Sequence, residues 1–311
     1  MGKGAYRPTT ESTSLFAMGI LLLGLGFAAA VDLRLREVPD WVWQFLGGVG
    51  AILGFLSIGL SSGPLGIALW ALASGFVLQH FFDWERYTVR RSTNWAPAID
   101  VAMYALVISV VIFAIGVDGL GSPGVPVIVV ATVANAILVR CLFEARALWG
   151  GADAKALMAA GLVVPLFGAT LLGVPSVAAG LSAVTPFAIS ILVNGLVLSI
   201  GVPVGIAVWN LRRGEFSWRT GFTTYRIPVA ALPSHHVWVR DPIVPGEDEA
   251  PLEEGAREDA QYRAELSDRL EARGIRSIRV SPQVPLVAFF AAGAVVALLA
   301  GNLAWDIAAV L

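Results

Sequence analysis

The stretch SLFAMGILLLGLGFAAAV, residues 14–31, contains no charged side chain and is followed directly by Asp32. A helix of about 20 apolar residues is long enough to cross the hydrocarbon core of a bilayer. Lys3 and Arg7 precede the stretch, as basic residues precede the apolar part of a secretory signal, but no clear small-x-small cleavage site ends it before a mature domain. We therefore interpret residues 14–31 as the first transmembrane helix.

The rest of the chain repeats this apolar pattern. Of the 311 residues, 57% are hydrophobic and 14% are charged, whereas about 25% are charged in an ordinary soluble domain. A chain of this composition cannot cover itself with polar groups, so lipid must be its solvent. We expect an all-α polytopic membrane protein with about eight transmembrane helices. The predicted spans are residues 14–31, 41–60, 64–82, 98–117, 124–146, 154–173, 178–210 and 285–305.

Residues 211–283 form the polar part of the sequence. They hold 11 of the 21 basic and 12 of the 23 acidic residues, so the charges nearly cancel and indicate no nucleic-acid surface. Apolar residues at helical spacing over 262–270, and strand-like alternation over 236–240 and 275–281, predict a small α+β insert. We expect it to tune substrate access or partner binding and to carry no chemistry. The chain thus divides into residues 1–210 with seven spans, 211–283, and 284–311 with the last span.

The basic residues of the loops predict the orientation, because Lys and Arg concentrate on the cytoplasmic side of a membrane protein. With the N-terminus outside, only Lys3 and Arg7 of the 21 basic residues lie outside. The opposite orientation would place all the others there. We therefore expect a multi-pass protein of the cell membrane with its N-terminus outside and residues 211–283 in the cytoplasm.

Two aspartates at the cytoplasmic ends of predicted spans are the candidate catalytic residues. Asp32 lies at the inner end of the first span and Asp153 at the inner start of the sixth, so the two share one depth. Ionisable residues in membrane helices are costly and often functional. Two carboxylates a few ångströms apart share one proton, which provides a general acid and a general base for activating water. The alternative is that each aspartate is a helix cap or an interfacial anchor.

The neighbours of the two aspartates are expected to shape the site. Gly150 and Gly151 permit unusual backbone angles and a close approach of substrate backbone, and Lys155 adds a positive charge at the same edge. Glu37 and Asp40 follow Asp32 in the same predicted cytoplasmic loop. The adjacent Arg34 and Arg36 are expected to anchor lipid headgroups.

The sequence contains no pattern for a metal or a cofactor. The three histidines lack the His-Glu-x-x-His spacing of a zinc protease, and neither a nucleophile elbow nor a phosphate-binding Gly-Lys-Ser/Thr loop is present. The single cysteine, Cys141, excludes an internal disulfide and a cysteine-based zinc module. We expect Glu144 to form a helical ion pair with Arg140.

Four segments of the chain resemble the archaeal branch of the type IV prepilin peptidases, which are GxGD-type intramembrane aspartyl proteases. VDLRLREVPDW at 31–41 resembles the first active-site region, in which an Asp precedes basic residues and a Val/Ile-Pro-Asn. WGGADAKAL at 149–157 resembles the GxGD motif and its x-Lys-x-Leu extension. Further similarity lies in Thr185-Pro186-Phe187 with Asn194, and in VSPQVP at 280–285.

The resemblance implies that Asp32 and Asp153 hydrolyse the leader of prepilin or pre-archaellin substrates at the cytoplasmic membrane face. Such substrates carry a short basic leader followed by an apolar helix held in the membrane. Glu37 and Asp40 are expected to meet this leader. The chain departs from the pattern where Ala152 replaces the second Gly of GxGD and where Asp40 replaces the common Asn. Two other functions remain open at this point, a transporter that uses buried acids and a non-catalytic membrane scaffold.

Overall fold

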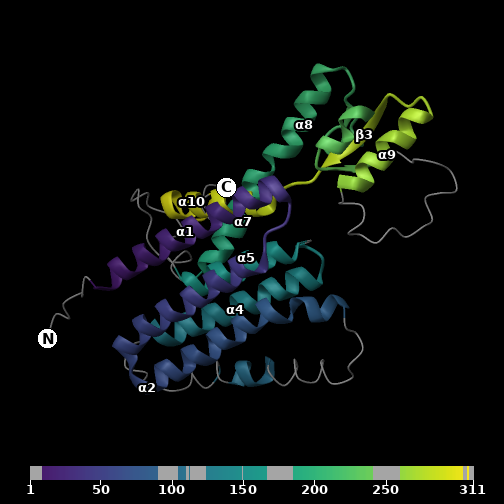
Figure 1. Cartoon of the computed structure of the whole chain (residues 1–311). Coiled ribbons are helices and arrows are strands. Elements are labelled where there is room, and N and C mark those ends of the chain that lie inside the picture. The colour runs from purple at the N-terminus through teal and green to yellow at the C-terminus, as the bar shows by residue number, and fades with distance from the viewer. Residues whose placement is uncertain are drawn as a thin grey trace. The chain divides into compact units, whose positions relative to one another are not determined.

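The computed structural model of the protein is mainly helical, with one small sheet (Figure 1). It divides into two compact units, of which the first is Met1–Leu198 with Leu286–Leu311 and the second is Ser199–Pro285. The predicted insert, residues 211–283, lies within the second unit. The structure describes residues 9–89, 104–109, 112, 124–148, 150–166, 185–240, 260–303 and 307.

Several helices among the described residues suit a multi-pass membrane protein. Five segments are long and apolar enough to cross a bilayer, and the helix α10 (Leu286–Ala300) is apolar but shorter. The predicted number of eight spans is not confirmed, because residues 98–117 and 167–173 lie largely or wholly outside the described part. The five segments are Leu15–Leu35, Asp40–Ile58, Gly63–Phe81, Val127–Glu144 and Phe187–Arg212.

The first two predicted spans correspond to α1 (Thr9–Leu35) and the first part of α2 (Asp40–Val89). The helical dihedral angles of α2 are interrupted at Gly63, where φ is 68° and ψ is −172°. Glycine adopts this conformation at little cost, and Pro64 after it cannot donate a backbone hydrogen bond. The predicted turn between the second and third spans therefore appears as a break inside α2.

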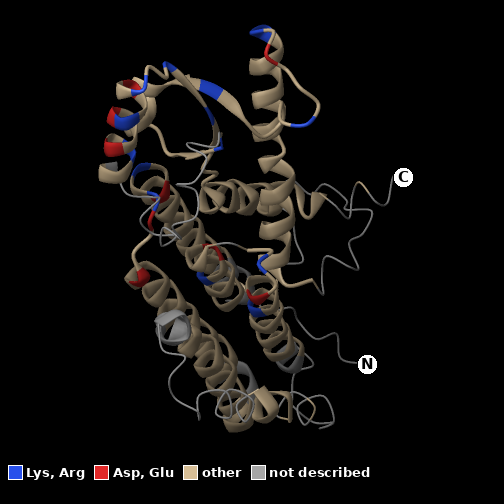
Figure 2. Cartoon of the chain, turned by 90° about the vertical axis from the view of Figure 1, so that its right-hand side faces the viewer, with Lys and Arg blue, Asp and Glu red and all other residues tan. Residues whose placement is uncertain are grey.

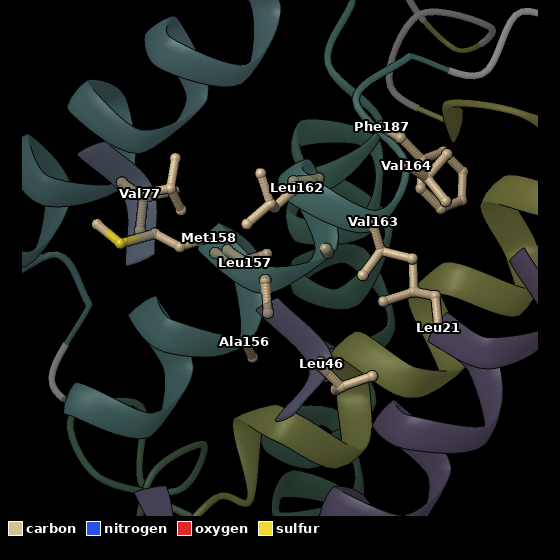
Figure 3. Packing of buried hydrophobic residues seen from close by; sticks show 14 of the residues in the cluster. Leu21, Leu46, Val77, Ala156, Leu157, Met158, Leu162, Val163, Val164 and Phe187 are labelled. Carbon is tan, nitrogen blue, oxygen red and sulfur yellow. The ribbon is translucent and has the colours of Figure 1, made fainter. Parts of the chain in front are cut away.

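The helix α5 (Gly151–Val163) forms the centre of the first unit. Every residue from Asp153 to Val163 is buried, and α5 packs against α1, α2, α4 (Gly124–Glu144) and α10. Figure 3 shows its Met158, Leu157 and Leu162 among apolar side chains of neighbouring helices. A Cβ atom on Gly50 would lie 2.8 Å from the backbone of Leu162, so glycine lets α2 approach α5 closely. A helix that is apolar on all sides is expected at such a position.

Asn194 joins α7 (Phe187–Ser199) to the end of α10. Its side chain is fully buried and donates hydrogen bonds to the carbonyl oxygens of Gly301 (2.8 Å) and Gly293 (3.4 Å). Its Oδ1 accepts a hydrogen bond of 3.0 Å from the backbone N–H of Leu303. Gly301 has a φ of 88° and follows the last residue of α10. Asn194 thus satisfies backbone groups that the end of a helix leaves unpaired.

The second unit contains a three-stranded antiparallel sheet with strand order β1-β3-β2. The helix α9 supplies Leu266 and Leu270 to a core that it shares with Ile227, Val237 and Val280. The predicted helix and the two predicted strands are confirmed, whereas β1 was not predicted. The elements are α8 (Gly201–Arg212), β1 (Tyr225–Pro228), η1 (Val229–Ser234), β2 (Val237–Val239), α9 (Ala260–Ala272) and β3 (Ser277–Pro282).

Candidate functional site

Asp153 lies in the first turn of α5 and is buried. Gly150 is the N-cap of this helix, and its backbone N–H donates a hydrogen bond to the Asp153 carboxylate. This is the return bond of a capping box, in which an acidic residue at the third helical position reaches back to the N-cap. The local sequence therefore fixes the direction of the carboxylate before any contact with another helix.

Position 150 requires glycine because the Asp153 carboxylate leaves no room for a Cβ atom there. A Cβ atom on Gly150 would lie 2.6 Å from Oδ2 of Asp153, which is closer than real Cβ contacts. Its backbone angles, φ −100° and ψ 131°, are ordinary extended values, and Gly151 is already helical. The expectation that these glycines supply unusual backbone angles is thus wrong, because Gly150 makes room for a carboxylate instead.

Asp32 lies in the last turn of α1 and is half-buried. Its carboxylate accepts a hydrogen bond from the backbone N–H of Val287, the second residue of α10. The first N–H groups of a helix have no partner within the helix, and its N-terminus favours negative charge. Asp32 therefore joins the C-terminal turn of α1 to the N-terminal turn of α10.

The structure brings the two predicted aspartates together. The helices α1 and α5 pack against each other, and the carboxylates of Asp32 and Asp153 lie close enough to interact electrostatically. Charged residues are sparse along the helices of the first unit (Figure 2), so an interacting pair of acids is unusual there. Each carboxylate also accepts a hydrogen bond from a backbone N–H, which holds it in place.

An ion pair between a buried lysine and a partly exposed aspartate joins α5 to the start of α2. Lys155, on α5, is 4% exposed, and its Nζ donates a hydrogen bond of 2.6 Å to Oδ1 of Asp40, the first residue of α2. Lys155 therefore neutralises Asp40 and joins α5 to the connection between α1 and α2. The expectation that Asp40 meets a substrate leader stays a prediction, although its carboxylate already has a basic partner.

The connection between α1 and α2 places an arginine beside Asp32. Arg36 has a φ of 57°, and its guanidinium interacts electrostatically with Asp32. Its Nε and Nη1 are buried and find no hydrogen-bond partner among the described residues. The expectation that Arg36 anchors lipid headgroups does not fit this burial, whereas Arg34 is exposed. Glu37 is also exposed, at the outer side of the connection.

The other sequence candidates lie elsewhere. The predicted ion pair between Arg140 and Glu144 on α4 is confirmed. His235 directly follows η1, and its Nδ1 donates a 2.8 Å hydrogen bond to the carbonyl oxygen of Ala231. No group of three or more His, Cys, Asp or Glu side chains comes together within the described ranges. Trp149, Asp100, Asp118 and Asp306 lie outside those ranges.

Sequence reasoning selected Asp32 and Asp153 but missed how they are held. Neither the hydrogen bond from Val287 to Asp32 nor the pairing of Lys155 with Asp40 has a local sequence signal, since the latter two are 115 residues apart. The capping box at Gly150 and Asp153 could have been found, because an acidic residue three positions after an N-cap is its signature.

Comparisons with known proteins gave no relative. No family model, no curated protein and no solved structure matches the chain.

Proposed function

We propose that this protein is an intramembrane aspartyl endopeptidase that removes the leader peptide of type IV prepilin-like or pre-archaellin substrates at the cytoplasmic membrane face. The observation that supports the proposal is the electrostatic interaction of Asp32 with the buried Asp153 where α1 and α5 pack together. Acidic groups within membrane helices are costly, and such groups are commonly functional.

The chemistry follows from two carboxyl groups that share one proton. The ionised carboxylate removes a proton from a water molecule as the oxygen of that water attacks the scissile carbonyl carbon. The protonated carboxyl donates its proton to the carbonyl oxygen, which gives a neutral tetrahedral intermediate. The intermediate then collapses: the carboxyl that took the proton from water donates it to the amine nitrogen as the C–N bond breaks, and the other carboxylate takes a proton from a hydroxyl group of the intermediate. This sequence leaves one proton on the pair, so the site is ready for another cycle.

The orientation and the span count belong to the same proposal. With the N-terminus outside and eight spans, both aspartates lie at the cytoplasmic face and residues 211–283 lie in the cytoplasm. A substrate whose apolar helix is held in the membrane presents its leader at that depth. The cut then falls at the boundary between the leader and the helix.

The backbone hydrogen bonds to both aspartates raise a structural alternative. Each carboxylate could serve only to cap a helix, Asp32 for α10 and Asp153 for α5. Substitution by Asn separates the two roles, because the Asn side-chain oxygen still accepts a hydrogen bond from a backbone N–H but has no acid–base chemistry near neutral pH.

The proposed function is tested with a synthetic substrate. The purified protein in detergent or lipid is incubated with a peptide that carries a short basic leader and an apolar helix, and the products are weighed by mass spectrometry. We expect one cut between leader and helix. A peptide with an acidic leader serves as the matched control. If the protein leaves the basic-leader peptide intact under all conditions in which it is folded, the proposed function is wrong.

A further inference from the structure

Three arginines lie in one row across the outer face of the sheet in the second unit. Arg226 on β1 is paired directly with Arg279 on β3. Arg240 follows β2, and its backbone N–H donates a 3.0 Å hydrogen bond to the carbonyl oxygen of Arg279. Because side chains alternate along a strand, all three point to the same face, opposite the apolar core that α9 covers.

This row is costly to the fold. Like charges directly opposite each other on neighbouring strands destabilise a sheet, and here three of them share one level. Arg226 and Arg240 are exposed. The inner face, in contrast, is filled by Ile227, Ile278 and Val280 in the expected alternation. A feature that the sheet does not need for its own stability points to an anionic ligand for the outer face.

An aromatic turn lies beside the row. We define it as residues 213–224, which connect α8 to β1. Phe216, Trp218 and Phe222 contact one another with ring-centroid distances of 5.4, 5.4 and 6.2 Å, yet Trp218 is 82% exposed. Aromatic side chains exposed in this way gather at the interface between membrane and water.

The aromatic turn is held in a fixed conformation. The buried side chain of Asn210 donates hydrogen bonds to the carbonyl oxygens of Gly221 (2.8 Å) and Thr224 (2.7 Å). A Cβ atom on Gly221 would lie 2.6 Å from the carbonyl oxygen of Ser217, so the turn is tight there. These contacts fix the backbone of the turn that carries the exposed Trp218.

The turn and the arginine row form one surface. Nη1 of Arg279 donates a 3.4 Å hydrogen bond to Oγ1 of Thr220 in the turn. The turn also begins directly after the apolar segment Phe187–Arg212, which is long enough to span a membrane. The aromatic side chains and the arginines therefore follow a membrane helix in the chain without an intervening linker. Residues 212–240 carry five arginines and one acidic residue, Glu215.

We propose that this surface binds the anionic headgroups of membrane lipids and so holds the aromatic turn and the sheet against the bilayer. The arginines attract lipid phosphate and carboxylate groups, since basic residues close to a membrane are drawn to its negative surface. Trp218 and Phe222 insert at headgroup level, where amphipathic rings are most stable. The inference does not rest on the proposed peptidase activity.

A lipid surface fits these observations better than a protein partner. The exposed aromatic rings beside the arginine row suit a partly apolar layer rather than water. The place of the turn in the chain favours lipid over a protein partner, because the turn directly follows the candidate membrane-spanning segment Phe187–Arg212.

Hydrogen exchange of the full-length protein in lipid nanodiscs tests the proposal. The rate for the aromatic turn and β1 is compared in phosphatidylcholine alone and in phosphatidylcholine mixed with phosphatidylglycerol. We expect the anionic lipid to slow exchange there by about tenfold, and high salt to reverse the effect. The double variant Arg226→Gln, Arg240→Gln should lose most of the slowing, and Arg226→Lys, Arg240→Lys should keep most of it.

Two controls make the result decisive. The pair Arg269→Gln, Arg273→Gln removes the same charge from α9, on the opposite side of the sheet, and should retain the full lipid effect. Exchange within α9 reports whether each variant keeps its fold. Equal exchange in both bilayers would mean that the surface is covered by protein, such as the acidic stretch 247–254 or a second copy, and would overturn the proposal. Equal loss in the control pair would also overturn it.

Discussion

Replacing Gly150 with alanine tests whether the position of the Asp153 carboxylate matters for cleavage. Replacement by alanine puts a Cβ atom 2.6 Å from Oδ2 of Asp153, so the carboxylate must turn away. We expect Gly150→Ala to lower the cleavage rate by about a hundredfold, because displacing a catalytic group by about 1 Å has an effect of that size. Cleavage of the synthetic substrate under single-turnover conditions measures it.

Gly26→Ala is the matched control, because a Cβ atom there meets nothing within 4 Å. It lies inside α1, where alanine stabilises a helix relative to glycine. Wild-type cleavage by Gly150→Ala would show that the carboxylate of Asp153 need not hold its observed position.

The ion pair of Lys155 and Asp40 predicts unequal effects of removing its two members. Lys155 is 4% exposed whereas the Asp40 side chain is 38% exposed, so only the lysine is left without water when its partner goes. We expect Asp40→Ala to destabilise the protein by about 2–3 kcal/mol, because it leaves a buried charge unpaired. Lys155→Met should cost less than about 1 kcal/mol, since Asp40 can be hydrated and an apolar side chain fills the space.

Thermal unfolding of both variants in the same detergent compares these costs. The double variant Asp40→Ala, Lys155→Met should recover most of the loss in Asp40→Ala. Equal losses in the two single variants would contradict the burial of Lys155.

Residue chemistry at the site was partly predictable from sequence. An acid at the end of an apolar stretch is conspicuous, so Asp32 and Asp153 were selected by position and by depth. The surroundings of Arg36 were not predictable, because a basic residue at a membrane edge normally faces headgroups. Its left-handed backbone conformation turns it toward Asp32 instead, and nothing in the local sequence signals that turn.

At the scale of elements, Asn194 should be essential for the end of α10. Asn194→Ala leaves the carbonyl oxygen of Gly301 and the N–H of Leu303 without their partner. Buried backbone groups without a hydrogen bond cost about 1–3 kcal/mol each. We expect a loss of about 2–4 kcal/mol in stability and faster hydrogen exchange around Leu303.

Leu196→Ala is the control on the same helix, because Leu196 is 45% exposed on the outside of the structure. It should change stability little and leave exchange near Leu303 unaltered. An Asn194→Ala variant as stable as this control would show that α10 ends independently of α7.

Helix prediction succeeded where length and apolarity agree, as in α1 and the two parts of α2. It was least informative for α5, whose described length of 13 residues is too short for a span by itself. The strand β1 was missed because it has four residues and ends in Pro228, which weakens the alternation. The pairing of β1 with β3 depends on tertiary structure, because 48 residues lie between Pro228, the end of β1, and Ser277, the start of β3.

For the whole molecule, the charge distribution predicts that residues 211–283 lie in the cytoplasm. In a Cys141→Ser background, a cysteine at Ser234, which is exposed, should react with a membrane-impermeant maleimide only after the cell is opened. A cysteine at position 122, which the sequence places outside, should react in intact cells. Labelling of Ser234→Cys in intact cells would reverse the topology and move the site to the other face.

The central claim is that Asp32 and Asp153 act together as acid and base, and cleavage by the two Asn variants tests it most directly. Asp32→Asn and Asp153→Asn keep an oxygen that can accept the backbone hydrogen bonds from Val287 and Gly150. We expect each variant to unfold at nearly the wild-type temperature and to cut the basic-leader substrate about a thousandfold more slowly. A folded variant of either aspartate that cuts at nearly the wild-type rate would contradict the account.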